Sequence, residues 1–488
     1  MHFNNNVREE LTMSDNYNGS IHIARGIKYS LDDIATKRNN NVLVVGASGT
    51  SKTRSYVVPN IIEASGSYVI SDPKGTLYLE YGDYLKNKGY KVCLLDFRNI
   101  NHSSRYNPLD YVKTDEDILK LATAMLGAVS SRDNDIYKYW ELSGAYLLAA
   151  VISYVKNELE EKYHNIGYIY RAISTRYIRV MYNNQLKKFL NDINRFYNEV
   201  EDVKVLREDL KYGVEFYGDA LIRHAENKGY VDVKMDGYFK FLNLYHPTSA
   251  SRFFSQLIDG ADKTMSCIYM QANSALQMYS SDKMIRLTKK SDFNFRDLGQ
   301  RKMALFVTCS DTDRSMDSFV SLFYSQCLQE LCGYADNDCR NGRLPMPVRF
   351  FLDDFATNFK IVDFDKIIAM IRSRGISANI IIQDLHQLKT CYKDAAETII
   401  NNCDTILYLG GNDYDTYEAM ARQMNASVGE IRNMGYLDCF VYRRMESSEK
   451  AKCIDLEKFK ICMRNNMDYH EKYRHRPAQK QRVGFQVC

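Results

Sequence analysis

The sequence predicts an α/β protein in which a parallel sheet domain is interrupted by an all-α domain. Short apolar runs rich in β-branched residues predict strands, and helical patterns lie between them, which is the order of βαβ units in a parallel sheet. This alternation stops near residue 112, and strands are expected again only after residue 300. The predicted strands span residues 41–45, 67–72, 90–97, 302–310, 346–356, 376–385 and 403–411.

These patterns divide the chain into four parts. They are an N-terminal entry segment (1–40), a sheet domain (41–112 and 291–440), an all-α domain (113–290) and a basic polar C-terminal tail (441–488). A short strand is expected at residues 20–26 of the entry segment. Residues 471–482 carry many basic side chains and are expected to be disordered.

The composition is that of an ordinary globular protein. The chain has 488 residues, enough for two or three domains, with 45% hydrophobic and 26% charged residues. The net charge of +4 does not by itself indicate a nucleic-acid partner. The 12 cysteines include no C-x-x-C pair, which favours free thiols in a reducing cytoplasm. The longest apolar run, residues 144–155, is too short to cross a membrane, and no signal-peptide pattern occurs, so we expect a soluble chain.

The stretch NVLVVGASGTSKT at residues 41–53 predicts a phosphate-binding loop. It joins an apolar strand to a helix start and approaches the pattern G-x-x-x-x-G-K-[ST], although a simple Gly/Ser-rich turn is the alternative. Backbone N–H groups and the helix N-terminus would surround phosphate, Lys52 would reach the β- and γ-phosphates, and Thr53 would bind Mg²⁺. Ser51 replaces a glycine, at a cost of about 1 kcal/mol or more if its φ is positive. The loop residues are Gly46, Ala47, Ser48, Gly49, Thr50, Ser51, Lys52 and Thr53.

The stretch VRFFLDDFA at residues 348–356 is an apolar strand that ends in two carboxylates. In nucleotide hydrolases with a phosphate-binding loop, such a strand delivers an aspartate beside Mg²⁺, and Asp353 fits that role. In such enzymes the next residue polarises the attacking water and is commonly glutamate. Here that position is occupied by Asp354. Its shorter side chain would place the carboxylate about 1 Å further back. A helix cap or a solvated turn is the alternative explanation for the pair.

A third apolar strand, ISANIII, is followed by Gln383. Ligands of open α/β folds bind at the carboxyl edge of the sheet, so Gln383 could sense the γ-phosphate or orient water there. A solvent-facing glutamine is equally consistent with the pattern. Arg372 and Arg374 precede this strand, and either could act across a subunit interface as an arginine finger. The alternative is a solvated helix end with a favourable dipole interaction.

Together these motifs resemble the type IV coupling proteins, the TraG/TraD group of conjugative transfer ATPases. The similarity runs from about residue 40 to 425 in the family's order and rests on VVGASGTSKTRSYVVPNI, YVISDPKG, YKVCLLDF, YNPLDY, FFLDDFA, IIIQDLHQL and NNCDTILYLGGND. The resemblance implies a RecA-like P-loop NTPase sheet domain interrupted by an all-α domain. It also implies ATP and Mg²⁺ as cofactors and a homohexamer with ATP sites at its subunit interfaces.

The resemblance implies roles for the residues of the motifs. Lys52 and Thr53 hold phosphate and Mg²⁺, Asp353 holds the metal, Asp354 is the candidate base and Gln383 is the sensor. Arg374 is the candidate finger. Members of this family recruit a relaxase-bound DNA strand to a type IV secretion channel, so the implied partners are a relaxase with single-stranded DNA and channel components. DNA binding is inferred from this resemblance alone.

Two kinds of departure from the family pattern bear on function. Ser51 and Asp354 put the rate of hydrolysis in question more than nucleotide binding. Many family members also carry N-terminal transmembrane helices, and none is predicted here. We therefore expect a cytoplasmic chain that partners, or a separate anchor protein, hold at the inner face of the plasma membrane. A lone soluble member of the family is the alternative.

Two other functions compete with a DNA-coupling ATPase. The first is a nucleotide-binding docking module with little or no hydrolysis, which the departures at Ser51 and Asp354 favour. The second is another RecA-like DNA translocase, such as a chromosome-segregation or virus-packaging motor. The helical insertion after the third strand and the motif YNPLD argue against the second function.

Overall fold

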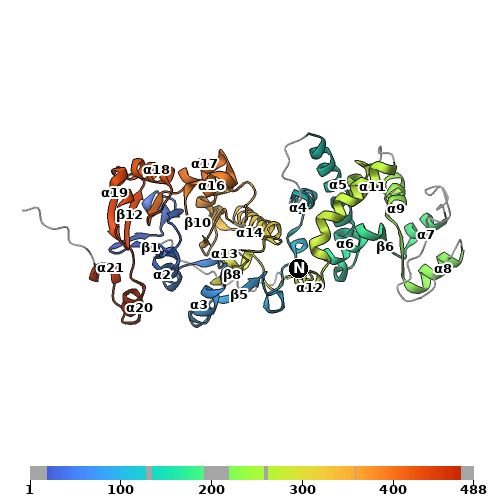
Figure 1. Ribbon diagram of the computed structural model, residues 1–488. Coiled ribbons are helices and arrows are strands. Elements are labelled where there is room, and N and C mark those ends of the chain that lie inside the picture. The colour runs from blue at the N-terminus through green and yellow to red at the C-terminus, as the bar shows by residue number, and fades with distance from the viewer. Residues whose placement is uncertain are drawn as a thin grey trace, which may run out of the picture. The chain divides into compact units, whose positions relative to one another are not determined.

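The computed structural model describes residues 19–127, 135–191, 219–257, 262–310, 312–357 and 359–473. The chain divides into two compact units, and each is described by itself (Figure 1). Unit 1 comprises Met1–Arg98, Asn294–Arg314 and Cys327–Cys488, and unit 2 comprises Asn99–Phe293 and Ser315–Gln326. Unit 2 therefore starts before residue 113, where the insertion was predicted to begin, and it includes a later segment of the chain.

A large sheet forms the centre of unit 1. Its order is β13-β12-β11-β3-β10-β9-β4-β8-β5, and the strands from β11 to β5 run parallel. Every residue of β3, β4 and β8 to β11 is buried, as expected when helices cover both faces of a parallel sheet. The predicted α/β class is confirmed. In sheet order the strands are Glu449–Lys452, Asp438–Arg443, Thr405–Tyr408, Val42–Val45, Ile376–Ile382, Val348–Leu352, Ser67–Ser71, Met303–Thr308 and Lys91–Asp96.

The helices of unit 1 connect and cover these strands. They are α1 (Asp33–Thr36), η1 (Thr53–Val57) with α2 (Val58–Ile62), α3 (Thr76–Asn87), α13 (Arg296–Gln300), the end of α14 (Asp317–Asp338), η8 (Arg340–Gly342), α15 (Phe364–Met370), η9 (Ile371–Arg374), α16 (Leu385–Tyr392), α17 (Ala395–Asn401), α18 (Tyr414–Met424), α19 (Val428–Arg432), α20 (Leu456–Arg464) and α21 (Tyr469–Lys472).

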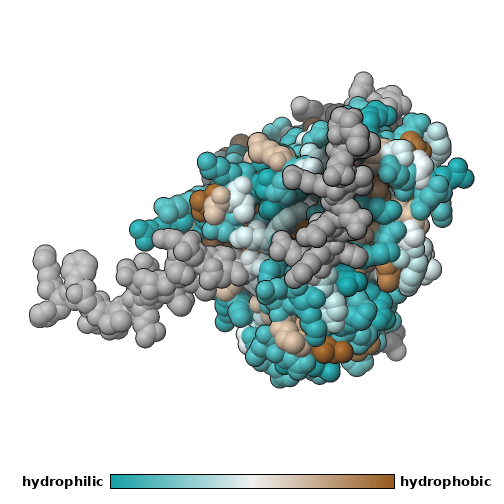
Figure 2. Space-filling model, turned by 90° about the vertical axis from the view of Figure 1, so that its left-hand side faces the viewer, coloured by the Kyte–Doolittle hydropathy of each residue, from teal (hydrophilic) through white to brown (hydrophobic). Residues whose placement is uncertain are grey.

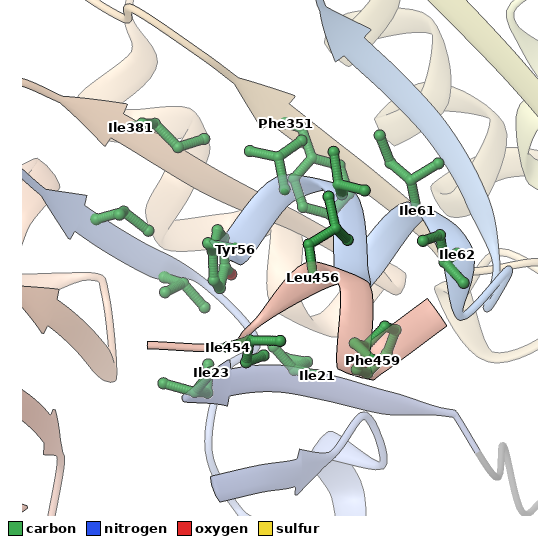
Figure 3. Close-up of a cluster of buried hydrophobic side chains, with 14 of the residues drawn as sticks. Ile21, Ile23, Tyr56, Ile61, Ile62, Phe351, Ile381, Ile454, Leu456 and Phe459 are labelled. Atoms are coloured by element: carbon green, nitrogen blue, oxygen red, sulfur yellow. The ribbon is translucent and has the colours of Figure 1, made fainter. Parts of the chain in front are cut away.

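Segments from both ends of the described chain cover the helix that follows β3. β1 (Ser20–Ala24) and β2 (Ile27–Ser30) pair as an antiparallel hairpin. Figure 3 shows Ile21 and Ile23 of β1 with Leu456 and Phe459 of α20 in one buried cluster around that helix. The same cluster includes Tyr56 of the helix and side chains of the sheet. The helix that follows the predicted phosphate-binding loop (η1 and α2) is therefore enclosed by hydrophobic packing.

The prediction of a polar tail is wrong for residues 441–473. The strands β12 and β13 and the helices α20 and α21 occupy most of this segment. Its buried residues, such as Leu456, Phe459 and Cys462, are diluted among lysines and glutamates, so their helical spacing is hard to recognise in the sequence. Residues 474–488, with most of the predicted disordered stretch, lie outside the described residues, as do residues 1–18. The short strand predicted at 20–26 is β1.

Unit 2 is mainly helical. Its helices are η2 (Ile100–His102), η3 (Pro108–Tyr111), α4 (Asp115–Gly127), α5 (Asp135–Glu158), η4 (Glu161–Tyr163), α6 (Ile166–Thr175), α7 (Asn184–Asn191), α8 (Asp219–Lys228), α9 (Met235–Tyr245), α10 (Ser249–Ser255), α11 (Asp262–Leu276), η7 (Gln277–Ser280), α12 (Asp282–Leu287) and the start of α14.

The prediction of an all-α insertion is wrong in one respect. β6 (Tyr177–Met181) and β7 (Tyr230–Lys234) form an antiparallel pair within unit 2. Arg179 and Asp232 face each other in this pair, and the arginine Nε donates to the carboxylate at 2.8 Å. Because the two charges neutralise each other when buried, each strand can place a charged residue inside. In the sequence these residues look like part of a solvated, charge-rich helical tract.

The motif YNPLD (residues 106–110) lies where the chain enters unit 2 and contacts the segment by which the chain leaves it. Asn107 is buried, and its side-chain amide donates to His164 O at 2.8 Å and to Asp110 Oδ1 at 3.1 Å. Its backbone N–H donates to Ser291 Oγ, and Ser291 N–H donates to Asp110 Oδ2. Pro108 starts η3, where a missing N–H costs nothing. The motif therefore fastens the entering segment to the segment that leaves.

Within the described residues, no helix combines the length and the hydropathy that a membrane crossing requires. On the face that Figure 2 shows, hydrophobic residues occur singly or in small groups among hydrophilic ones. Scattered apolar residues of this kind are usual on a folded surface and do not mark a docking patch.

Replacing Asn107 tests the role of YNPLD. Asn107→Ala leaves buried polar groups without partners, so we expect unit 2 to lose about 2 kcal/mol of stability. Urea titrations followed by circular dichroism of the full chain measure the stability of each variant. Asn337→Ala is the control, because this exposed asparagine bonds only its own helix, and we expect it to change stability by less than about 0.5 kcal/mol. Equal effects of the two changes would contradict this role.

Candidate functional site

The predicted phosphate-binding loop leaves the carboxyl end of β3 and is held by the ends of both neighbouring strands. Gly46 N–H donates to Ile382 O at 3.1 Å, and Ala47 N–H donates to Gly410 O at 2.9 Å. A Cβ at position 46 would lie 2.5 Å from Thr50 Oγ1 and 3.0 Å from Leu409 Cβ, so any other residue would force these neighbours to shift. The loop is therefore fixed between β10 and β11, which flank β3 in the sheet.

The middle of the loop presents unpaired backbone donors. The N–H groups of Ser48, Gly49 and Ser51 donate to no other residue in the part of the chain that the structure describes. The helix that follows begins with a π-helical turn, η1, which is common at functional sites. Neighbouring N–H groups at a helix N-terminus form a concavity that suits an anion.

Ser51 has a φ of 64°, in the left-handed region. The sequence left open whether this position needs a positive φ, and the structure shows that it does. A residue with a Cβ pays roughly 1–2 kcal/mol in this conformation, which explains why the usual pattern has glycine here. The loop therefore keeps its shape at the expense of local strain.

Lys52 and Thr53 bring the loop into contact with the acidic strand end. Lys52 Nζ donates to Gly46 O at 2.5 Å and to Ala47 O at 3.1 Å. Thr53 Oγ1 donates to Asp353 Oδ2 at 2.8 Å. The two residues that were predicted to bind Mg²⁺ are thus directly hydrogen-bonded, although β10 lies between their strands.

Burial shifts the pKa of two charged groups in this cluster. Lys52 is 9% exposed and Asp353 is 7% exposed. Burial lowers the pKa of the Lys52 ammonium, which the nearby Asp354 and Asp353 oppose. Burial, and then the negative charge of Asp354, raise the pKa of Asp353 to about 6. A bound cation would stabilise the ionised form of Asp353 in this setting.

Two further predicted residues lie at the same edge. Asp354 follows Asp353 directly and has a φ of 51°. Gln383 follows Ile382, whose carbonyl accepts from Gly46 N–H, and the backbone N–H of Gln383 donates to Gln387 Oε1 at 3.2 Å. Both side chains are half-buried. The structure therefore brings the loop, both aspartates and Gln383 together.

Arg374 lies elsewhere in unit 1. It precedes β10, whereas Gln383 follows it, so the length of β10, about 20 Å, separates them. The guanidinium of Arg374 forms a two-point ion pair with Asp336, with bonds of 2.9 and 2.8 Å. Arg372 is also at this end, where it donates to Asp33 O. Arg374 is thus not part of the site of its own chain, and action on a neighbouring subunit stays a prediction.

Two contacts of the site were missed in the sequence. Ser71 Oγ, at the end of β4, donates to Asp353 O at 3.2 Å and steadies the strand end. Gly410, with a φ of 93°, turns its carbonyl toward Ala47. The Gly-Gly pair after an apolar strand was the only available signal for the second contact.

Replacing Ser51 by glycine tests the strain in the loop. Ser51→Gly removes the left-handed penalty but makes the unfolded chain more flexible, so we expect a net gain of about 0.5–1 kcal/mol. Ser48→Gly is the matched control, because Ser48 is not in the left-handed region and can only lose stability. Thermal unfolding of both variants gives the comparison, and a loss of stability in both would contradict the strain.

The raised pKa of Asp353 predicts a pH-dependent stability. Because the folded chain binds this proton more tightly than the unfolded chain, Asp353 destabilises the free protein increasingly as the pH rises from about 4 to about 6. We therefore expect Asp353→Asn to be more stable than the parent protein by roughly 1–3 kcal/mol at pH 7.5. The advantage should shrink at pH 4.5. An advantage that is the same at both pH values would show that Asp353 does not titrate as proposed.

Comparisons with known proteins place the chain in a family. The family model described as Type IV secretory system Conjugative DNA transfer matches residues 5–432. Conjugal transfer protein TraG of Escherichia coli is 23% identical over 402 residues, which cover 78% of this chain and 54% of that protein. The chain thus spans about half the length of this relative.

Solved structures of the conjugative coupling protein TrwB share the fold. The unbound form has a TM-score of 0.58 at 14% identity, covering 91% of this chain and 90% of that chain. A complex of TrwB with the GTP analogue GDPNP has a TM-score of 0.59 at 14% identity, covering 91% of both chains. A complex with ADP and Mg²⁺ has a TM-score of 0.55 at 15% identity, covering 85% of both.

The family match covers both the loop and the acidic strand end, and the TrwB fold matches nearly the whole chain. The chain belongs to the type IV secretory system conjugative DNA transfer family, the type IV coupling proteins.

Proposed function

We propose that this chain is an ATP-hydrolysing coupling protein for conjugative DNA transfer. The observation that carries the proposal is the 2.8 Å hydrogen bond from Thr53 Oγ1 to Asp353 Oδ2. It joins a phosphate-binding loop to the carboxylate of a second strand, which is the arrangement that holds Mg²⁺ beside nucleotide phosphates in P-loop NTPases. Membership of the coupling-protein family supplies the biological context.

The side chains of the site fit Mg²⁺ and nucleotide phosphates. The Thr53 hydroxyl and the Asp353 carboxylate are hard oxygen ligands of the kind that Mg²⁺ prefers. The unpaired N–H groups of the loop would donate to phosphate oxygens. Lys52 would exchange its carbonyl contacts with Gly46 and Ala47 for a phosphate. Bound Mg²⁺ would neutralise the negative charge that develops on the transferred phosphoryl group.

Three residues would act on the reaction itself. Asp354 would accept a proton from the attacking water, and its carboxylate forms no hydrogen bond with any described residue. Gln383 would orient that water or contact the γ-phosphate. Arg374 would reach the site of a neighbouring subunit in a homohexamer. To do so, its guanidinium would have to leave Asp336.

We also propose partners and a location on the basis of family membership. The chain would recruit relaxase-bound single-stranded DNA to the components of a type IV secretion channel. Partners, or a separate anchor protein, would hold it at the inner face of the plasma membrane. With a net charge of only +4, DNA contacts would come from local Lys and Arg side chains to phosphates, so binding would weaken with salt.

A docking module that binds nucleotide with little hydrolysis is the second candidate. The left-handed φ values of Ser51 and Asp354 favour it, because both residues lie where the reacting groups must be aligned. A misplacement of about 1 Å can lower a rate roughly 100-fold. Both candidates bind nucleotide, so only turnover separates them.

Phosphate release from ATP with Mg²⁺ tests the proposal. We expect the full chain to hydrolyse ATP, faster with single-stranded DNA, and Lys52→Ala to lose roughly 100-fold or more of this rate, because a preorganised positive group facing the phosphates is lost. Lys86→Ala is the matched control, because Lys86 is exposed and pairs only with Asp83, and its rate should not change. If the parent protein binds ATP without turnover, the docking module is the better account.

A further inference from the structure

We infer that Asn60 is a positioning residue that sets the phosphate-loop helix against the strand that ends in Asp353. The inference rests on the proposed function and adds a residue to it. Asn60 lies in α2, seven residues after Thr53 (60 − 53), and is completely buried. It touches neither the loop nor the predicted Mg²⁺ ligands, so any effect on them has to act through the helix.

The side-chain amide of Asn60 uses its whole hydrogen-bonding capacity. Its Oδ1 accepts from His22 N–H at 3.1 Å and from Arg349 Nη2 at 2.9 Å. Its Nδ2 donates to His22 O and to Tyr56 O, both at 2.8 Å. An asparagine amide offers two donors and two acceptor positions, so all four are paired. The amide pairs with both the N–H and the C=O of His22, as the backbone of a neighbouring β-strand would.

Arg349 is the partner of Asn60 on the strand side of this contact. It lies in β9, four residues before Asp353 (353 − 349), and is 1% exposed. No carboxylate in the described part of the chain forms an ion pair with it. Its guanidinium lies over the Phe351 ring at 5.0 Å, and its contact with Ser65 Oγ is long, at 3.4 Å. A buried cation needs compensation, and Asn60 in the last turn of α2 supplies the short bond, at the negative end of the helix.

The helix and the strand are therefore joined at two levels. Thr53 bonds Asp353 at the edge of the sheet, and Asn60 bonds Arg349 deeper inside. Seven helical residues rise about 10 Å, and four strand residues span about 13 Å, so the two links are spaced similarly on both elements. Tyr56 of the same helix also bonds the sheet, because its hydroxyl donates to Asn379 Oδ1 in β10 at 2.6 Å. The bond from Arg349 to Asn60 adds a direct hydrogen bond to β9 and so helps to fix the height of the Thr53 hydroxyl relative to the Asp353 carboxylate.

The test measures the Mg²⁺ concentration that half-saturates Mg²⁺-dependent ATP binding to the full chain, well below the unfolding temperature. Asn60→Leu removes every amide bond, and we expect this concentration to rise about three- to ten-fold. Asn60→Asp keeps an acceptor for Arg349 and for His22 N–H but turns its second oxygen toward the carbonyls of His22 and Tyr56, so its value should lie between those of the parent protein and Asn60→Leu. Ser65→Ala is the control on the other side of Arg349 and should leave the value unchanged.

The outcomes separate this inference from the proposed function. A purely structural residue would lower the unfolding temperature of Asn60→Leu and leave its Mg²⁺ half-saturation equal to that of the parent protein, which would overturn the inference. A value for Asn60→Asp as high as that of Asn60→Leu would also count against it, because the bond to Arg349 would then contribute nothing. If the parent protein shows no Mg²⁺-dependent ATP binding at all, the proposed function itself fails.

A measurement on the parent protein covers the case in which Asn60→Leu does not fold. If Asn60 couples the helix to β1 and β9, ATP with Mg²⁺ should slow hydrogen exchange of the His22 amide, which donates to Asn60 Oδ1. The amide of Arg179 in β6, which donates to Tyr168 Oη within unit 2, serves as the internal reference. Equal exchange of the His22 amide with and without ATP and Mg²⁺ would overturn the inference.

Discussion

The site depends on the contact between the start of one helix and the end of one strand. Thr53 belongs to the helix after β3, and Asp353 follows β9, so only the parallel arrangement of the two strands brings them to one edge. The same packing shields Lys52 and Asp353 from water. This burial lowers the pKa of Lys52 and raises the pKa of Asp353. A ligand that carries both phosphate and a divalent cation would stabilise the charged forms of both groups.

The two departures from the usual pattern occur at positions with the same backbone conformation. Ser51 and Asp354 both adopt left-handed backbone conformations, at opposite sides of the site. At position 51 this makes serine more costly than glycine. At position 354 it favours aspartate over the longer glutamate, because Asp and Asn enter the left-handed region more readily than other residues with a Cβ. Strained backbone of this kind commonly persists at functional sites, where the surrounding packing holds it in place.

Much of unit 1 could be predicted from the sequence, because buried parallel strands appear as apolar runs. The same signal placed Asp353 and Gln383 at strand ends. It failed where charged residues are buried against each other, as in the pair formed by Arg179 and Asp232. It also failed for Arg349, a cation inside an apolar strand whose partner Asn60 lies 289 residues away in the chain. Periodicity reports which face is buried, whereas such polar partners are defined only by the folded structure.

Equilibrium binding of ATP with and without Mg²⁺, to the parent protein and to Asp353→Asn, tests the central claim most directly. If Thr53 and Asp353 form the metal site, Mg²⁺ tightens ATP binding to the parent protein and has little effect on the variant, which still binds ATP through the loop. An equal effect of Mg²⁺ on both proteins would contradict the account, because the cation would then be held without Asp353.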